Sequence, residues 1–394
     1  METSSQRDFN LRILLILSLG HLVTDIYQGV LPAILPFLKT KLSLSYALTG
    51  AVMMAANLAS SVVQPLFGYL SDKKGKAFLL PLGCLTAGIG MSLISVPSSY
   101  AMVLALVVIS GLGVASFHPE GYKTARFFTG DKMATGMSVF SVGGNLGFAI
   151  GPVIAVYIVT HLGFEFLPVI VFLSLLFLFS LLFAWKTIQG VQTTSKPLGI
   201  IGPSSQRGAY SALFLLIATV IMRSWTQLGL MAYLPFYYMD YLGGDALYAG
   251  KLVSVFLLGG VVGTIGGSYV ADRWGHKKYL IATLGLSSLF FPFLFQAKGI
   301  LLFLALGVFG MVLISSFTVT IVMAQQLLPH NLGVASGLMV GFAIGTGGLG
   351  VTVLGIVADH FGVATALKSI NILPVMGFLL AFLIKYPSPT ESGK

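Results

Sequence analysis

The chain has 394 residues, of which 56% are hydrophobic and only 9% are charged, and its mean hydropathy is +0.94. A soluble globular domain carries about 25% charged residues, so this composition excludes a water-soluble fold. The formal net charge is +10, but the basic residues neither gather on one amphipathic face nor alternate with aromatic residues, as they do in nucleic-acid-binding patches. We therefore expect membrane lipid, and no nucleic acid, as a partner.

Apolar runs long enough to cross a bilayer, about 20 residues each, follow one another along nearly the whole chain. Their period is not two, and they are about twice as long as a barrel strand, so helices are the expected spanning structure. The expected fold is an all-α membrane protein of twelve transmembrane helices in two pseudo-symmetric six-helix bundles. The expected spans are residues 10–38, 46–70, 76–97, 99–123, 132–160, 164–187, 209–239, 246–271, 277–297, 299–326, 332–358 and 363–385.

The basic residues fall unevenly among the loops. Twelve spans place both termini on one side of the membrane, and most Lys and Arg residues lie in the loops of that side. The opposite loops hold only Lys39, Lys41, Lys298 and Lys368. Because cytoplasmic loops are enriched in Lys and Arg, we expect both termini in the cytoplasm. The first apolar run has no small-residue cleavage pattern at its end, so we expect it to be a retained helix.

The chain contains an internal repeat. The segment from Gly68 to Lys76 closes the second span, a related segment from Gly267 to Lys278 closes the eighth, and their aspartates lie half the chain apart. This duplication predicts two bundles, residues 1–188 and 209–394, joined by a cytoplasmic linker, residues 189–208, that is rich in Gly, Pro and Ser. Parallel repeats of this kind place a substrate site at their interface, near the bilayer midplane.

Both copies of the repeated segment resemble the signature of the major facilitator superfamily, Gly-x-x-x-Asp-(Lys/Arg)-x-Gly-(basic), and the resemblance covers essentially the whole chain. In that family the segment holds the cytoplasmic face of each half together and is broken and remade during alternating access. A carboxylate beside Arg or Lys makes charge-assisted bonds suited to this role, although such charges can also serve only to set topology. The resemblance implies a conformational latch formed by Gly68, Asp72, Lys73, Gly75, Lys76, Asp272, Arg273 and Gly275.

The fifth span carries a second motif. Gly147, Gly151 and Pro152 resemble the Gly-x-x-x-Gly-Pro pattern in the fifth helix of the superfamily's antiporters. Small residues at four-residue spacing let neighbouring helices approach closely, so we expect a helix-packing role. Ser138 stands where the antiporter motif usually begins with Gly. The motif favours export as the direction of transport.

Two further segments narrow the resemblance. The runs from Gly20 to Gly29 and from Ser116 to Gly121 are similar to the fosmidomycin-resistance family of bacterial efflux proteins. That family is associated with export of a phosphonate antibiotic in exchange for protons, which implies a monomeric transporter in the bacterial inner membrane. The fourth span has Val107 and Ser110 where many drug–proton antiporters carry an Arg-x-x-Gln-Gly pattern, so its proton path must use other residues.

Ionisable groups at bilayer depth are costly and usually face a cavity or a partner. Asp25 lies near the middle of the first span, and His21, Asp25 and Gln28 share one helix face because of their spacing. A carboxylate there can bind and release a proton as its solvation changes. We expect proton coupling by Asp25 and substrate contacts from all three residues; the alternative is a fixed ion pair or a hydrogen-bonded packing role.

His118 and Glu120 flank Pro119 towards the cytoplasmic end of the fourth span. Neighbours two apart point to opposite faces of a regular helix, but Pro119 can bend the segment, so either residue can reach the cavity. We expect both to take part in proton coupling. The alternatives are that Glu120 pairs with Lys123 at the membrane interface and that His118 is a hydrogen-bonded helix contact.

Arg223 is the only Arg well inside a span of the second half. A guanidinium group binds phosphonate or carboxylate oxygens in a bidentate way, so Arg223 is the candidate for recognition of an anionic substrate. The alternative is a permanent counter-ion to Asp25. Further candidate substrate contacts are Tyr122, Trp225, Gln227 and Tyr233.

Other function classes lack support in the sequence. No Walker-type phosphate-binding run appears, and no His-Glu-x-x-His or Gly-x-Ser-x-Gly run appears, so we expect neither an ATP-driven pump nor an enzyme. Cys84 is the only cysteine, and we expect no cofactor and no metal site. The remaining alternatives to a proton-coupled exporter are a proton-coupled importer of an organic anion and a membrane receptor or scaffold that does not transport.

Overall fold

The computed structural model describes residues 9–44, 46–74, 77–194, 206–238, 242, 246–343 and 345–386. Every regular element in these ranges is helical. Eleven of the described helical segments are long and apolar enough to cross a membrane, and the shorter apolar helix Leu79–Ser95 coincides with the third expected span. The expected all-helical membrane fold is therefore confirmed. Many large apolar side chains remain exposed, as lipid-facing residues do, among them Phe172, Leu182, Phe214 and Leu289.

The chain forms two compact units whose boundaries differ from those expected from the repeat. The first unit comprises residues 1–198 together with 330–342, and the second comprises residues 199–329 together with 343–394. The division at residues 189–208 that the repeat predicts stays a prediction, and the first unit includes the short segment 330–342. This segment begins the eleventh span and packs on helices of the first unit.

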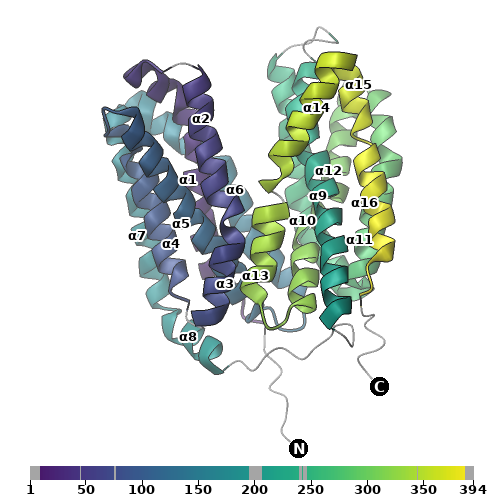
Figure 1. Cartoon of the computed structure of the whole chain (residues 1–394), viewed down its shortest axis with the longest axis horizontal. Helices are drawn as coiled ribbons and strands as arrows, with labels where there is room; N and C mark the ends of the chain where they lie inside the picture. Colours follow the sequence, from purple (N-terminus) through teal and green to yellow (C-terminus); the bar gives the residue numbers. More distant parts are fainter. Residues whose placement is uncertain are drawn as a thin grey trace, which may run out of the picture. The chain divides into compact units, whose positions relative to one another are not determined.

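The first unit contains every expected span of the first half (Figure 1). Helix α1 packs along α6, and α4 packs along α5. The third span comprises α4 and a 3-10 turn, η2, and the sixth comprises the 3-10 segment η3 and α7. The elements are α1 (Leu11–Leu42), α2 (Tyr46–Asn57), η1 (Leu58–Val62), α3 (Gln64–Lys74), α4 (Leu79–Ser92), η2 (Leu93–Ser95), α5 (Tyr100–Arg126), α6 (Met133–His161), η3 (Phe164–Ile170), α7 (Val171–Leu182), α8 (Trp185–Thr194) and α13 (Leu332–Ser336).

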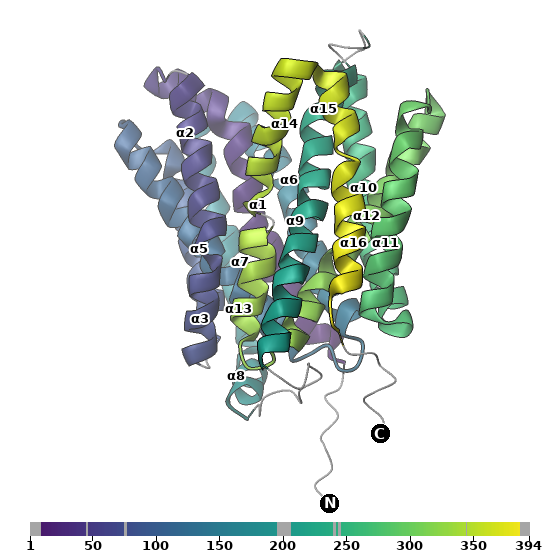
Figure 2. The same cartoon turned by 45° about the vertical axis from the view of Figure 1, so that its right-hand side comes forward.

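The second unit contains the remaining spans. Helix α10 packs along α12, while α14 and α16 lie against α9 (Figure 2). The twelfth span is divided between α15 and α16. The elements are α9 (Gln206–Phe236), α10 (Ala246–Trp274), α11 (His276–Phe290), η5 (Phe291–Phe295), α12 (Ile300–Leu327), α14 (Gly347–Phe361), α15 (Val363–Ser369) and α16 (Ile372–Leu383).

The expected linker and the sixth span are shorter than the sequence suggested. The sixth span ends at Leu182, and a two-residue turn separates it from α8. Helix α8 continues to Thr194, and α9 begins at Gln206, so both ends of the expected linker are helical. Residues 195–205 lie outside the described part of the chain.

Glycines allow α1 and α6 to pack closely. A Cβ atom added to Gly151 would lie 2.5 Å from the backbone oxygen of Ile26, and one added to Gly147 would overlap the backbone oxygen of Leu22. The Pro152 ring lies against Gly29 of α1. The motif from Gly147 to Pro152 therefore forms the contact between the two helices, as small residues do in membrane helix pairs.

The second and eleventh spans are both interrupted by π-helical turns. Segment η1 separates α2 from α3, and η6 (Gly337–Ala343) follows α13. Within the first unit these turns meet, because a Cβ atom on Gly337 would lie 2.7 Å from the Gln64 backbone oxygen, and one on Gly341 would lie 2.6 Å from that of Ser61. Such π-helical turns occur frequently at functional sites.

Candidate functional site

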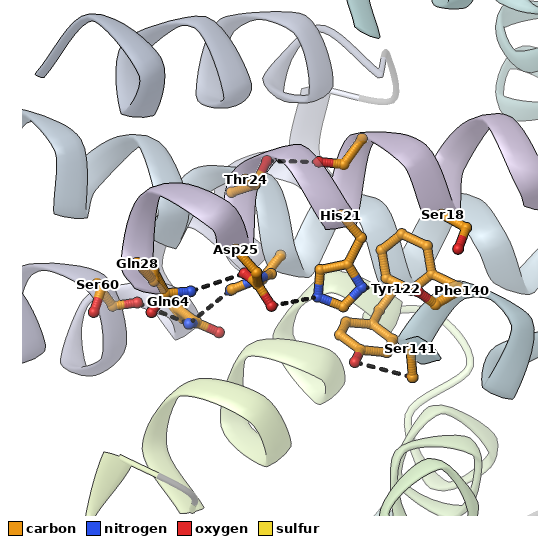
Figure 3. Close-up of polar contacts among 12 residues, drawn as sticks. Ser18, His21, Thr24, Asp25, Gln28, Ser60, Gln64, Tyr122, Phe140 and Ser141 are labelled. Atoms are coloured by element: carbon orange, nitrogen blue, oxygen red, sulfur yellow. Dashed lines mark hydrogen bonds and ion pairs between the residues drawn. The ribbon is translucent and has the colours of Figure 1, made fainter. Parts of the chain in front are cut away.

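Asp25 lies at the centre of a polar cluster in the first unit (Figure 3). Its Oδ1 atom is 2.8 Å from the amide nitrogen of Gln28 and 2.9 Å from Nε2 of His118. Its Oδ2 atom is 3.3 Å from Nε2 of His21. The exposed fraction of the Asp25 side chain is 13%, and that of each histidine is 5%. The carboxylate is therefore nearly enclosed by nitrogen atoms from α1 and α5.

Outer partners hold both histidines in place. The Nδ1 atom of His21 lies 2.9 Å from the backbone oxygen of Phe140, and its ring stacks on the Phe140 ring at 4.3 Å. The Nδ1 atom of His118 lies 3.3 Å from the amide nitrogen of Gln64, which also donates to the backbone oxygen of Ser60 at 2.7 Å. These contacts fix the orientation of each imidazole ring around Asp25.

Tyr122 and Glu120, also on α5, differ in their relation to the cluster. The Tyr122 hydroxyl lies 3.1 Å from the Ser141 hydroxyl, and its ring packs edge-on to His21. Glu120 is fully buried, and its Oε1 atom accepts a hydrogen bond from Thr124. Helix α5 stays continuous through Pro119. His118 contacts Asp25, whereas Glu120 accepts a hydrogen bond from Thr124 of its own helix.

The cluster has the size of a metal site. His21, Asp25 and His118 each offer one ligand atom, and these atoms lie within 4.8 Å of one another. Two imidazoles and a carboxylate can hold a divalent transition metal, and the same atoms can hold a proton. The hydrogen bonds on the outer nitrogens of the two histidines distinguish between these occupants.

The first copy of the repeated signature caps a helix. Asp72 Oδ1 accepts the backbone N–H of Gly333, and Oδ2 accepts that of Val334, both at 2.9 Å. These donors lie in the first turn of α13, where a helix has no internal acceptors and a carboxylate is favoured by the helix dipole. The Lys123 ammonium lies 3.8 Å from Asp72 and donates to the Ser71 backbone oxygen at 2.6 Å.

The other expected latch residues of the first copy differ in their surroundings. The Cα atom of Gly68 faces the Gly333 backbone so closely that an added Cβ atom would lie 2.5 Å from the Gly333 carbonyl carbon. Lys73 is exposed and lies 5.9 Å from the centre of the Tyr69 ring. Gly75 and Lys76 lie outside the described residues.

The second copy has different partners. Asp272 Oδ1 lies 3.2 Å from Nε2 of His276, whose Nδ1 lies 3.2 Å from Oε1 of Gln326. The Arg273 guanidinium lies 4.2 Å from the centre of the Tyr269 ring. Gly275 joins α10 to α11 with a φ of +97°, which side chains with a Cβ atom rarely adopt.

Arg223 on α9 is a buried cation of the second unit. Its exposed fraction is 2%, and among the described residues its Nε and Nη1 atoms have no hydrogen-bond partner. The guanidinium carbon lies 5.5 Å from the centre of the Phe317 ring. A cation–π contact offsets only part of the cost of burying a charge, so this guanidinium retains unused hydrogen-bonding capacity.

The other three candidate substrate contacts on α9 have different surroundings. The Trp225 ring packs against Gly350, and its buried Nε1 atom has no hydrogen-bond partner within the described ranges. Gln227 is partly buried. The Tyr233 hydroxyl donates to the backbone oxygen of Val351 at 2.9 Å, so it fastens α9 to α14.

Comparison with known proteins identifies the family. The chain matches the model of the Major Facilitator Superfamily over residues 17–350 and, in a second match, over residues 212–394. The chain belongs to the major facilitator superfamily.

Two relatives extend over nearly the whole chain. The chain is 33% identical over 376 residues to the fosmidomycin resistance protein of Escherichia coli (strain K12), a match that covers 93% of this chain and 91% of that protein. It is also 33% identical over 378 residues to the uncharacterized MFS-type transporter YfnC of Bacillus subtilis (strain 168), covering 94% and 92% of the two chains. The family resemblance expected from the sequence is thereby confirmed.

A solved structure agrees on the fold. The crystal structure of the Major Facilitator Superfamily transporter FucP in the outward conformation matches with a TM-score of 0.71, covering 96% of this chain and 99% of that chain. The identity is 15%, so this likeness concerns the fold alone. The protein is an integral membrane transporter of this superfamily.

The sequence did not predict several groups that contact the two histidines of the Asp25 cluster. Gln64 and Ser60 of the second span hold His118, and the Phe140 carbonyl holds His21. A signal for Gln64 was available, because an amide at bilayer depth requires polar partners. No side-chain pattern reveals a backbone carbonyl such as that of Phe140.

Proposed function

We propose that the protein is a proton-coupled efflux antiporter that exports a small anionic, phosphonate-like compound by alternating access. The observation that carries this proposal is the burial of Arg223 without a hydrogen-bond partner for Nε or Nη1 among the described residues. An Arg at bilayer depth costs about 2.5 to 3.5 kcal/mol on insertion scales. A bound phosphonate or carboxylate would offset that cost with two parallel N–H···O bonds.

Proton coupling is supported by the cluster around Asp25. A carboxylate that is 13% exposed and in contact with two imidazoles can change its charge when its surroundings change. The cluster and Arg223 lie in different units, so we assign proton binding to the first half and anion recognition to the second. Trp225 and Gln227 are proposed as additional substrate contacts, and Tyr122 as a contact near the proton site.

Export is supported by the relative that is named for resistance to fosmidomycin. The packing of the motif from Gly147 to Pro152 against α1 fits the antiporter pattern expected from the sequence. Location in the bacterial inner membrane, with cytoplasmic termini and a monomeric state, belongs to the same proposal. The cap that Asp72 places on α13 is proposed as a latch that opens and closes during transport.

The direct test uses proteoliposomes and fosmidomycin as the probe. An antiporter accumulates fosmidomycin inside vesicles whose interior is acidic, because protons leaving the vesicle drive the compound inward. A proton symporter accumulates it only when the exterior is acidic. A receptor binds it without flux under either gradient. Accumulation into acidic vesicles that disappears on adding a protonophore is the expected result, and either of the other two patterns contradicts the proposal.

A further inference from the structure

The hydrogen-bond partner of His21 determines where this imidazole carries its proton. The Phe140 carbonyl can only accept, so the His21 Nδ1 atom, 2.9 Å away, must donate. A neutral imidazole with its proton on Nδ1 has a lone pair on Nε2. That atom faces Asp25 Oδ2 at 3.3 Å, and an ionised carboxylate oxygen is also only an acceptor. Two buried acceptors cannot stably face each other at this distance without a proton between them.

In His118 the other ring nitrogen, Nε2, carries the proton. The Ser60 carbonyl accepts from the Gln64 amide, so the nitrogen of that amide must face it, and its second N–H points at His118 Nδ1. The Nδ1 atom of His118 is therefore an acceptor, and its Nε2 atom carries the proton and donates to Asp25 Oδ1 at 2.9 Å. This hydrogen-bond pattern is complete with a neutral imidazole and requires no additional proton.

A metal ion fits this pattern less well than a proton does. If the Nε2 atom of His118 bound a metal, its Nδ1 atom would carry the proton, and this N–H would point at the donating amide nitrogen of Gln64. Two donors would then face each other. Metal-bound histidines normally give the second N–H to an oxygen acceptor, as His21 does with Phe140 but His118 does not.

The neighbouring elements offer few other groups that could take this proton. Helices α4, α5, α6 and α7 pack against α1. Of the titratable side chains on α5, Tyr122 faces His21 and bonds to Ser141, and Lys123 bonds to Ser71. Glu120 accepts a hydrogen bond from Thr124 of its own helix, and Arg126 donates to Thr129. On α4, Cys84 bonds to Ser174. Helix α6 meets the cluster with Gly144, whose added Cβ atom would lie 2.6 Å from Asp25 Oδ2. Gly144 of α6 therefore lies directly beside both His21 Nε2 and Asp25 Oδ2.

We infer that His21 Nε2 and Asp25 Oδ2 share a single proton, and that this pair is the proton-binding group of the transport cycle. This assignment rests on the proposed function for its role in transport. It moves His21 from substrate binding to proton binding and makes His118 a permanent N–H donor. Loss of the shared proton leaves two facing acceptors, so deprotonation favours a rearrangement between α1 and α6, or the entry of water.

The test uses the full-length protein in detergent, labelled with ¹⁵N-histidine, and nitrogen NMR to read which ring nitrogens carry protons. The chain has six histidines, and the signals of His21 and His118 are assigned by substituting each. Asp25→Asn supplies an amide in place of the carboxylate, so we expect the His21 pair to lose about one bound proton per chain in a difference titration. His118 should keep its proton on Nε2 in both proteins.

Substitutions of each histidine separate the two assignments. His21→Asn keeps an N–H that can reach the Phe140 carbonyl and removes Nε2, so it should lose the same proton. His118→Gln keeps an N–H directed at Asp25, and the exposed His161→Gln serves as the matched control; both should retain the proton. If His118→Gln loses the proton while His21→Asn keeps it, the assignment is overturned.

Zinc addition tests the alternative occupant. We expect one equivalent of Zn²⁺ to leave the nitrogen signals of both histidines unchanged. Stoichiometric Zn²⁺ binding that releases the shared proton and moves the His118 proton to Nδ1 would overturn the assignment. None of these measurements involves flux, so their failure leaves the proposed antiport intact, and absence of proton-driven flux in vesicles would leave the shared proton intact.

Discussion

Asp72 and Gly333 are 261 positions apart in the chain, yet the Asp72 carboxylate accepts the backbone N–H of Gly333 at 2.9 Å. The same carboxylate accepts the N–H of Val334, so one side chain of α3 provides the N-terminal cap of α13. Capping by a side chain from another helix ties the start of the eleventh span to the end of the second. If the expected latch forms here, its atoms are the Asp72 carboxylate oxygens and the backbone N–H groups of Gly333 and Val334.

Removal of this cap should release α13. Asp72→Ala removes both acceptors, and loss of an N-cap costs about 0.5 to 2 kcal/mol, which corresponds to a change of roughly two- to thirtyfold in the ratio of closed to open latch. The measurement is thiol labelling of a cysteine introduced at the buried position Leu332, after Cys84→Ser. We expect faster labelling in Asp72→Ala. Lys186→Ala, at an exposed position outside the expected latch, is the control and should label like the parent. Equal labelling in Asp72→Ala would argue against a latch.

We expect the buried charge of Arg223 to destabilise the folded protein and to be required for binding of an anionic substrate. Replacing a buried charge by an apolar side chain of similar volume is often neutral or stabilising, so Arg223→Met should melt at the same or a higher temperature than wild type. Fosmidomycin should raise the melting temperature of wild type through binding but not that of Arg223→Met. Arg223→Lys should show a reduced rise because it lacks the planar fork.

A neutral analogue of fosmidomycin provides the specificity control for this prediction. Its binding should change less than that of fosmidomycin in Arg223→Lys. Equal losses for both ligands, or a strong fall in the melting temperature of Arg223→Met, would show that Arg223 is only structural.

The contact between α1 and α6 should not tolerate a single methyl group. Gly147→Ala places a Cβ atom against the Leu22 backbone oxygen, and overpacking of this kind costs about 1 to 3 kcal/mol. Gly266→Ala is the matched control, because an added Cβ atom there meets nothing within 4 Å. It should stabilise α10 by up to about 1 kcal/mol. Thermal unfolding in detergent measures both, and a Gly147→Ala protein as stable as Gly266→Ala would rule out the close contact.

Asp25 should be required for the proton-driven part of transport. Asp25→Asn keeps the size of the side chain and removes its charge, so we expect it to fold normally and to lose accumulation of fosmidomycin against its gradient. Vesicle flux with and without an imposed pH difference measures this. The exposed Asp131→Asn is the control, and undiminished proton-driven accumulation by Asp25→Asn would remove Asp25 from the coupling mechanism.

The sequence predicted the helical spans and the face shared by His21, Asp25 and Gln28, because both depend on local periodicity. It could not specify that His118 meets Asp25, since that contact depends on the packing of α5 beside α1. The expectation that Glu120 pairs with Lys123 was an alternative based on their spacing, whereas the Lys123 ammonium lies on Ser71 and near Asp72. Long-range contacts override local spacing here.

The partner of Asp72 was similarly hidden from sequence reasoning. The repeated signature indicated a carboxylate that binds an Arg or Lys, but the Asp72 carboxylate accepts two backbone N–H groups at 2.9 Å, whereas the Lys123 ammonium is 3.8 Å away. Neither Gly333 nor Val334 carries chemistry that identifies it in a sequence. The repeat places the segment 330–342 in the second bundle, and its packing on α3 and α5 likewise leaves no signal in the sequence.

Helix α3 carries Gln64 at its first residue and Asp72 near its last turn. Eight residues of α-helix span about 12 Å, so a single short rod holds the amide that orients His118 at one end and the cap of α13 at the other. A rod of this length tilts or slides as one body. A movement of α3 as one body that withdraws Asp72 from α13 would also displace the Gln64 amide from His118, so α3 connects the polar cluster around Asp25 with the cap of α13.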